Sequence, residues 1–257
     1  MRMHSFIICA VLLTSMTQAQ TWQLLPIDAS GCTNIAENPW EPGKLYFLHH
    51  GAIATTTDNG DSWEYLNLST FTDMTPLSIT FDSERPGTWY LLTEYNGLVI
   101  TTDGGRTFTF NNDGLDLEYQ GLQLIQHPDD PDILYLLFEN ALYRSTDRGK
   151  TWPEILLGFG PLYGCHAVYT RGMWMDPENP ERIQVFMNQD EQFFYESEDE
   201  GRTWEHKPWP FRSGNSKVRI TKDGAVWVSY FRSTDQGDTW IKYNTDADTL
   251  ITGGLAV

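Results

Sequence analysis

The eight residues STDRGKTW, from Ser145 to Trp152, combine an acid, a glycine, hydroxyl side chains and a tryptophan. Read alone, this combination is typical of a catalytic loop. The chain contains nearly the same motif at four other places: TTDNGDSW at 56–63, TDGGRTF at 102–108, SEDEGRTW at 197–204 and STDQGDTW at 233–240. Because a catalytic loop normally occurs once in a chain, the repetition favours a structural role.

The five motifs align on an aspartate, and the spacing inside each motif is constant. A glycine follows the aspartate by two residues, a Thr or Ser by four and an aromatic residue by five. The intervals between consecutive aspartates are 45, 44, 52 and 36 residues, a range typical of repeat architectures. The aspartates are Asp58, Asp103, Asp147, Asp199 and Asp235, and the aromatic residues are Trp63, Phe108, Trp152, Trp204 and Trp240.

A second repeated element, a proline turn, precedes each of the first four aspartates by 16 to 19 residues. Its prolines are Pro42, Pro86, Pro131 and Pro180. Between these markers, short runs of β-branched and aromatic residues alternate with Gly, Pro, Asn and Asp, and no long run has a helical period. In the third unit the runs are 122–125, 133–138, 141–144 and one that begins at Trp152.

Each unit therefore predicts four antiparallel strands joined as a meander. Four-stranded sheets that repeat every 40 to 50 residues around a centre form a β-propeller. We expect an all-β chain with five recognisable blades and a partial sixth blade built from the two termini. Residues 21–25 resemble the strand that follows a motif, and 250–257 resemble the opening of the fifth unit, 219–226. A fragment of a longer propeller is the other interpretation, and it is slightly favoured because a chain that stops within a strand leaves its sheet without partner strands.

The motifs resemble the Asp-box (BNR) repeat, Ser/Thr-x-Asp-x-Gly-x-Thr-Trp, over residues 21 to about 243. Sialidases, sortilin-type receptors, xyloglucan hydrolases and photosystem II assembly factors carry this repeat. The resemblance implies a propeller whose boxes lie away from the ligand face. It does not imply an activity, because these families include hydrolases, receptors and assembly factors.

The residues of the box also suit a turn between two strands. Its aspartate can accept hydrogen bonds from backbone N–H groups of its own turn, and its Thr or Ser adds a hydroxyl partner. Its glycine suits a positive φ, and its aromatic side chain can pack between adjacent sheets. We therefore expect each box to stabilise the fold and to take no part in catalysis.

Residues 1–19 have the three parts of a secretory signal peptide: a short basic start, the apolar run 6–13, and small residues at the cleavage positions in Thr17-Gln18-Ala19. We expect cleavage there, leaving 20–257 as a single domain that is secreted or periplasmic. The apolar run is far shorter than the roughly 20 residues that span a bilayer, and no second long one follows. We therefore expect no membrane insertion.

Charge and motifs exclude several other classes of function. The chain has 17 Lys plus Arg against 35 Asp plus Glu, and a net charge of -18 disfavours nucleic acid as a partner. We expect no cofactor and no metal, because there is no Gly-rich phosphate loop and the adjacent His49 and His50 would point to opposite faces of a strand. Cys32 and Cys165 remain after cleavage, either as one bridge or, more in keeping with the pattern, as two separate buried thiols.

Strand parity predicts where a ligand would bind. Successive turns of a meander alternate between the two ends of a sheet, so the boxes and proline turns share one end. The other end is formed by 67–75, 111–120, 157–170 and 208–215, together with the short turns that follow each second strand. Exposed aromatic residues there can stack on sugar rings or grip a peptide. The candidate ligand-binding residues are Tyr163, His166, Trp209, Arg212, His49 and Tyr95.

The expected function is an exported, non-catalytic binding or scaffolding propeller whose partner is a protein segment or a carbohydrate. The alternative is a glycoside hydrolase of sialidase-like or xyloglucanase-like type. Resemblance to sialidases implies three arginines, a tyrosine nucleophile and an acidic catalyst, but their Arg-Ile-Pro sequence is absent here. A pair of catalytic carboxylates is not recognisable from sequence alone, because the separation that defines it is spatial.

Overall fold

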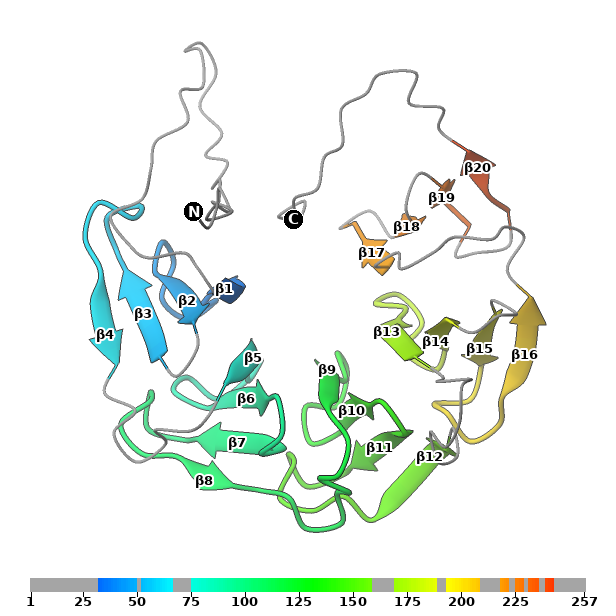
Figure 1. The fold of residues 1–257 in the computed structure, drawn as a ribbon, viewed down its shortest axis with the longest axis horizontal. Helices are drawn as coiled ribbons and strands as arrows, with labels where there is room; N and C mark the ends of the chain where they lie inside the picture. The colour runs from blue at the N-terminus through cyan, green and yellow to red at the C-terminus, as the bar shows by residue number, and fades with distance from the viewer. Residues whose placement is uncertain are drawn as a thin grey trace, which may run out of the picture.

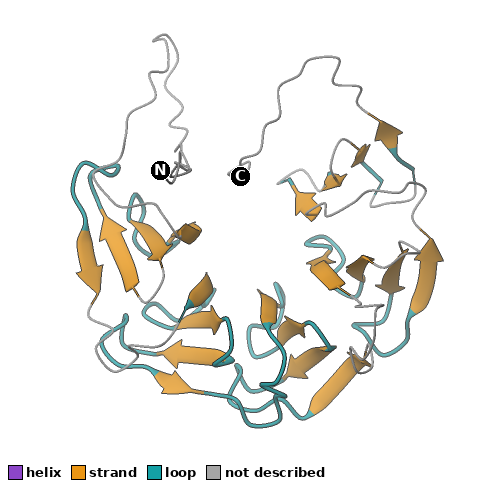
Figure 2. Ribbon diagram, viewed as in Figure 1, coloured by secondary structure: helices purple, strands orange, loops and turns teal. Residues whose placement is uncertain are grey.

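A computed structural model describes residues 32–49, 52–66, 75–158, 169–188, 193–208, 218–221, 225–228, 231–235 and 239–242. These residues form five four-stranded sheets, every pairing within them is antiparallel, and they contain no helix (Figure 2). The predicted all-β architecture of four-stranded blades is confirmed. The predicted signal peptide and the terminal segments assigned to a sixth blade lie outside the described residues.

The chain builds one blade after another, and each blade takes four consecutive strands. Blade 1 contains β1 (Cys32–Glu37), β2 (Leu45–His49), β3 (Ala52–Thr56) and β4 (Glu64–Leu66). Blade 2 contains β5 (Pro76–Phe81), β6 (Trp89–Thr93), β7 (Leu98–Thr101) and β8 (Thr109–Phe110). Blade 3 contains β9 (Gly121–Gln126), β10 (Leu134–Phe138), β11 (Ala141–Ser145) and β12 (Glu154–Gly158).

The last two described blades repeat the same order. Blade 4 contains β13 (Tyr169–Met175), β14 (Ile183–Asn188), β15 (Phe193–Ser197) and β16 (Glu205–Pro208). Blade 5 contains β17 (Val218–Ile220), β18 (Val226–Val228), β19 (Phe231–Ser233) and β20 (Ile241–Lys242). In Figure 1 the blades stand side by side in an arc, with the first strand of each on the inside and the fourth on the outside.

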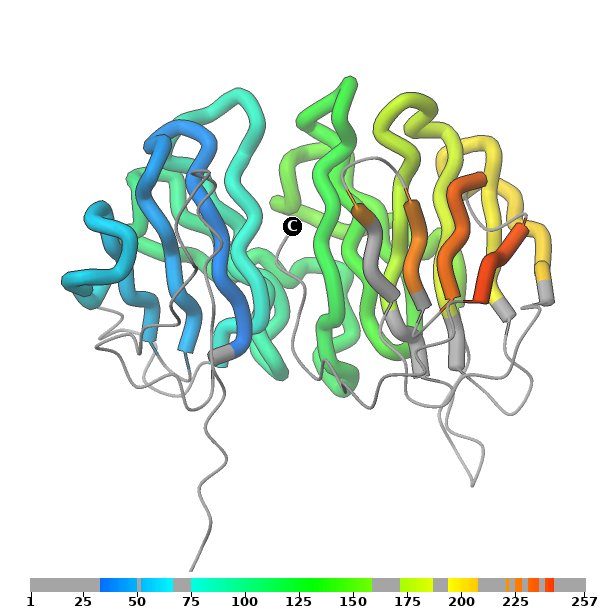
Figure 3. The backbone as a smooth tube through the Cα atoms, turned by 90° about the horizontal axis from the view of Figure 1, so that it is seen from above, coloured from blue at the N-terminus to red at the C-terminus, as the bar shows by residue number. Residues whose placement is uncertain are grey.

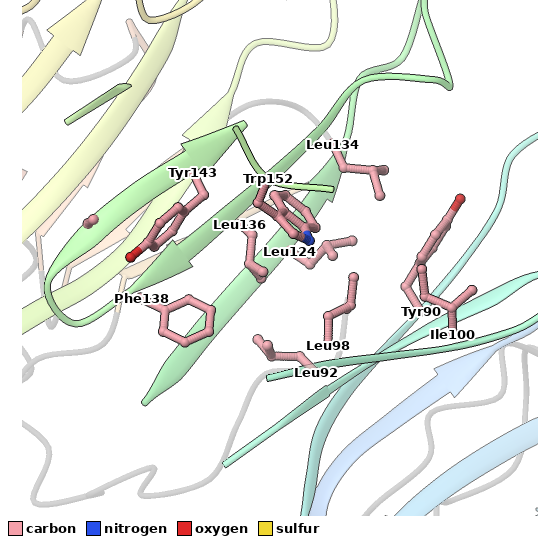
Figure 4. Close-up of a cluster of buried hydrophobic side chains, with 11 residues drawn as sticks. Tyr90, Leu92, Leu98, Ile100, Leu124, Leu134, Leu136, Phe138, Tyr143 and Trp152 are labelled. Carbon is pink, nitrogen blue, oxygen red and sulfur yellow. The ribbon is translucent and has the colours of Figure 1, made fainter. Parts of the chain in front are cut away.

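Neighbouring blades are joined by buried side chains at each seam. Between blades 2 and 3, Trp152 lies among leucines of both sheets, including Leu98 and Leu134 (Figure 4). Similar clusters join blades 1 and 2, blades 3 and 4, and blades 4 and 5. Each blade thus buries its apolar faces only against its immediate neighbours, as in other repeat proteins.

One strand boundary differs from the prediction. The fourth strand of blade 3 begins at Glu154 and not at Trp152. The Trp152 backbone N–H donates to the carbonyl oxygen of Asp113 at 2.8 Å, and the indole is almost completely buried. The tryptophan therefore belongs to the seam between blades and not to the ladder of its own sheet.

The proline turns share a polar cap that the sequence prediction missed. Four residues before each proline, a side chain accepts a hydrogen bond from the backbone N–H two residues later, at 2.9 to 3.2 Å. The backbone N–H of the same residue donates to the carbonyl six residues later, which closes the turn. The capping residues are Asn38, Asp82, His127 and Asp176. Short polar side chains that bond their own turn in this way are typical of Asx turns.

Candidate functional site

The connections between strands divide the molecule into two ends, seen side-on in Figure 3. In blades 2, 3 and 4, a backbone N–H of the box donates to a carbonyl of the proline turn of the same blade, at 2.9 Å. The residue pairs are Gly104 with Gly87, Arg148 with Asp132, and Glu200 with Glu181. We call this end the box face and the opposite end, where the second strand turns into the third, the loop face.

The box of blade 3 shows what its residues do. Asp147 Oδ1 accepts a hydrogen bond from the Thr151 backbone N–H at 2.9 Å, and Oδ2 accepts one from the Thr151 hydroxyl at 2.8 Å. The Ser145 hydroxyl donates to Asp147 Oδ1 at 2.7 Å and accepts a hydrogen bond from the Gly149 N–H at 2.9 Å. Both carboxylate oxygens are therefore engaged by the turn itself.

The same hydrogen bonds hold the carboxylates of the other boxes in their charged form. Donation from the hydroxyl and the backbone N–H of Thr107 lowers the pKa of Asp103 to about 2. The equivalent groups of Thr203 lower the pKa of Asp199 to about 2. A general acid or base for neutral pH needs a pKa near the working pH, so these carboxylates are unsuited to proton transfer.

Two features of the box were not predicted. The hydroxyl two residues before the aspartate bridges the carboxylate and the glycine N–H in blades 1 to 4, and only the later hydroxyl had been given a role. The residue before the box glycine also has a positive φ, which is unusual for a residue other than glycine. Asn59, Arg148 and Glu200 all have φ near 60°, at 60°, 61° and 59°.

Asp147→Ala is expected to lower the free energy of unfolding by about 1 to 3 kcal/mol at pH 7, because donors in the turn lose their acceptor. Partial burial raises the pKa of Asp147, but hydrogen bonds from Thr151 and Ser145 outweigh it and lower the folded-state pKa below the ordinary value. The contribution is therefore fully present above about pH 4 and is lost as pH falls through the folded-state pKa. Urea unfolding of both proteins across this range measures it, and a difference independent of pH would contradict the assignment.

A buried arginine links blades 2 and 3 on the box face. The Arg148 guanidinium contacts Asp82 at 2.7 Å and Glu84 at 2.8 Å, and its Nε donates to Asp132. The Arg148 side chain is 9% exposed and that of Asp82 is fully buried, whereas those of Glu84 and Asp132 are more than half exposed. The box position of Arg148 is occupied by a different residue in each of the five motifs, so the repeat gives no sign of its partner in the neighbouring blade.

Asp82 is the acceptor on which this cluster depends. It accepts hydrogen bonds from the Tyr90 hydroxyl at 2.6 Å and from the Gln126 side chain at 3.2 Å, in addition to those from Arg148. Burial raises the pKa of the Asp82 carboxyl, but the Tyr90 and Arg148 hydrogen bonds outweigh it, so the net pKa is lowered. Trp40 of blade 1 donates its indole N–H to the Asp82 carbonyl at 2.8 Å, so three blades meet at one residue.

On the loop face, the β6–β7 turn is held by its own residues and by the next connection. The Thr93 hydroxyl donates to the Gly97 carbonyl at 2.8 Å and accepts from the Asn96 N–H at 3.1 Å. Asn112 accepts from the Leu98 N–H at 2.9 Å and donates to the Asn96 carbonyl at 2.8 Å. Tyr95 stands in this fixed turn with 62% of its surface exposed.

The connection 111–120 continues across the seam to blade 3. The Glu139 N–H donates to the Gln120 carbonyl at 3.0 Å, and the Glu139 carboxylate accepts from the Gln120 N–H at 3.4 Å. Asp116 accepts from the Glu118 N–H at 3.1 Å and from the Asn140 side chain at 3.5 Å. The two short turns and the connection between them thus form one hydrogen-bonded surface, which we call the blade 2–3 loop surface.

Of the six candidate ligand-binding residues, the structure describes two. His49 is the last residue of β2 and pairs with Ala52 across the β2–β3 turn, and it is partly buried. Tyr95 is exposed in the next blade along the arc. Tyr95 lies in the turn after the second strand of its blade, whereas His49 ends the second strand of its own blade. Tyr163, His166, Trp209 and Arg212 lie outside the described residues, as do Cys165 and His50.

The described part of the chain has neither a cluster of metal ligands nor a membrane-spanning helix. No group of three or more His, Cys, Asp or Glu side chains there is arranged to hold a metal ion. No helix among the same residues is long and apolar enough to cross a membrane.

Comparison with known proteins supports the fold, and the similar proteins include both glycoside hydrolases and a peptide-bound protein. No family model matches the chain. The xyloglucanase Xgh74A of Acetivibrio thermocellus is 24% identical over 254 residues, which covers 84% of this chain and 25% of that protein. The chain thus spans about a quarter of the length of this curated relative.

Solved structures with propeller-type folds resemble the chain over most of its length. The GH74 enzyme of Niastella koreensis has a TM-score of 0.61 at 17% identity, covering 82% of this chain and 38% of the enzyme. YCF48 bound to a D1 peptide has a TM-score of 0.53 at 18% identity, covering 77% of this chain and 64% of YCF48. At these identities the likeness shows that the chain has a β-propeller-type fold, one shared by glycoside hydrolases and by a peptide-bound protein.

Proposed function

We propose that this chain is an exported, non-catalytic binding or scaffolding propeller. Its ligand is a protein segment or a glycan, held on the loop face. The observation that carries the proposal is Tyr95, a tyrosine exposed on a turn that hydrogen bonds hold in place. A large aromatic side chain on a preorganised surface offers contact area at little cost in conformational entropy.

The chemistry of the boxes supports binding over catalysis at the box face. Their carboxylates have lowered pKa values and are saturated by donors of their own turns. Arg148, the buried cation of that face, is paired with three carboxylates. Neither group is available to a substrate without breaking the fold, so the loop face remains for function.

Tyr95→Ala is expected to weaken ligand binding by about 5- to 30-fold while leaving the melting temperature unchanged. A central aromatic contact is worth about 1 to 2 kcal/mol of binding energy, and an exposed side chain contributes little to stability. A glycan array and an immobilised peptide library supply the ligands, and calorimetric titration of the strongest one measures the change.

Tyr65→Ala is the matched control for this variant. Tyr65 is 63% exposed, like Tyr95, but it lies on β4, the outer strand of blade 1. Binding that falls equally in both variants would contradict a site on the loop face. Failure of both screens to yield any ligand would contradict the proposed function itself.

A glycoside hydrolase is the second candidate, and the similarity to a xyloglucanase over 84% of this chain favours it. The described carboxylates open to a substrate on the loop face include Asp116, Glu118 and Glu139. An assay of sugar release from xyloglucan and from fluorogenic glycosides by the purified protein distinguishes the binding function from the enzymatic one. Release of sugar that is lost on replacement of one carboxylate by its amide would replace the binding proposal by the enzymatic one.

A further inference from the structure

Two apolar side chains are exposed where blades 2 and 3 meet on the loop face. Tyr95 is 62% exposed and Leu117 is 39% exposed. The Leu117 side chain packs against Gly97, two residues after Tyr95, because a Cβ added to Gly97 would stand 2.8 Å from a Leu117 methyl group. The two residues therefore belong to one small apolar area that a partner can cover.

Acidic residues adjoin Tyr95 and Leu117 in the chain, and the same connections contain no basic residue. Residues 94–97, 111–120 and 139–140 contain no Lys or Arg. Glu94, Asp116, Glu118 and Glu139 form no ion pair within the described part of the chain. On the box face, by contrast, Arg148 contacts three carboxylates and offsets part of their charge.

Two of the four carboxylates, those of Asp116 and Glu139, are held in place before any partner arrives, and the backbone at Glu94 and Glu118 is fixed. Asp116 caps the Glu118 N–H and contacts Asn140, and Glu139 accepts from the Gln120 N–H. The Glu94 N–H donates to the Thr75 carbonyl at 3.0 Å, which ties the β6–β7 turn to the start of β5. Little ordering is then needed when a ligand binds, which improves affinity.

We propose that the blade 2–3 loop surface binds a basic protein segment, with an apolar side chain of the segment on Tyr95 and Leu117 and its Lys or Arg side chains facing the surrounding carboxylates. The inference rests on the proposed function and selects between its two ligand classes. Fixed negative charge attracts a cationic segment and repels acidic peptides and acidic sugars. A neutral glycan can donate hydroxyl hydrogen bonds to these carboxylates, but it gains no attraction between opposite charges.

Two synthetic peptides test the inference. The two peptides have the same length and the same apolar residues. The positions between the apolar residues are lysines in one peptide and glutamates in the other. We expect the lysine peptide to bind in calorimetric titration and the glutamate peptide not to bind. Glu94→Gln combined with Glu118→Gln removes two charges of the surface without removing a side-chain hydrogen bond. This double variant is expected to lower the affinity for the lysine peptide by about 5- to 30-fold.

Asp61→Asn combined with Glu198→Gln is the matched control. These two acids are exposed on the box face, so the variant has the same net charge as the loop-surface variant. It is expected to change affinity less than about two-fold once salt screens distant charges. Equal weakening in both variants would show general attraction to an acidic chain and would overturn the inference.

The remaining outcomes separate the inference from the proposed function. A glycan or an acidic peptide whose binding depends on Tyr95 but not on Glu94 and Glu118 would overturn the inference and leave the loop-face function standing. Absence of lysine-peptide binding would also overturn it. If every ligand found is insensitive to Tyr95, both the inference and the proposed function fail.

Discussion

Asp82→Ala is expected to lower the free energy of unfolding by about 3 to 5 kcal/mol. Asp82 is fully buried and accepts hydrogen bonds from Arg148, Tyr90 and Gln126 as well as from two backbone N–H groups of its own turn. Removal of Asp82 takes away the buried partner of Arg148 and leaves the Tyr90 hydroxyl and two backbone N–H groups without their acceptor, and such changes are strongly destabilising. Urea unfolding monitored by tryptophan fluorescence measures the loss.

Glu84→Gln is the control for this variant. Glu84 contacts the same guanidinium, but its side chain is 59% exposed, so its loss is expected to cost less than about 1 kcal/mol. The comparison shows whether the loss of stability depends on the burial of the carboxylate or only on its charge. Equal and small effects of the two substitutions would show that the cluster does not hold blades 2 and 3 together.

Trp152→Ala is expected to cost about 3 to 5 kcal/mol, because it opens a cavity in the core between blades 2 and 3. Trp152 is 1% exposed and packs against leucines of both sheets. Its indole N–H also donates to the Asn111 carbonyl of blade 2 at 3.1 Å, so the substitution removes a hydrogen bond across the seam. The midpoint of chemical unfolding measures the loss.

Trp152→Phe tests which part of the side chain matters. Blade 2 has Phe108 at the equivalent box position, and this side chain packs in the seam with blade 1 although it has no N–H to donate. We expect the phenylalanine variant to recover most of the stability and to remain destabilised by about 1 kcal/mol for the lost hydrogen bond and the smaller ring. A Trp152→Ala protein as stable as Tyr65→Ala would contradict the inter-blade role.

The repeat made the fold predictable from sequence. Five boxes at nearly constant spacing, with proline turns in register before four of them, predict four strands in each unit, and the strand bounds predicted for the third unit agree to within about two residues. Successive turns of an antiparallel meander lie at alternate ends of the sheet, so the order of the strands also predicts which connections belong to the loop face and which to the box face. These features are local and periodic, so they are visible without knowledge of long-range contacts.

The contacts between blades were not predictable in the same way. Arg148 and Asp82 are 66 residues apart, and nothing in the box motif requires an arginine at that position. The caps at Asn38, Asp82, His127 and Asp176 do repeat, but the presence of histidine in one of them hides the pattern. The acidic surface around Tyr95 escaped notice because its carboxylates come from three separate connections.

Binding and stability are expected to depend on opposite faces, and two variants test this most directly. Thermal unfolding and affinity for one common ligand are measured for the unmodified protein, Asp147→Ala and Tyr95→Ala, at a temperature where all three are folded. We predict that Asp147→Ala lowers the melting temperature and binds normally, whereas Tyr95→Ala melts normally and binds weakly. Lost binding with an unchanged melting temperature in Asp147→Ala would show that the box is part of the functional site.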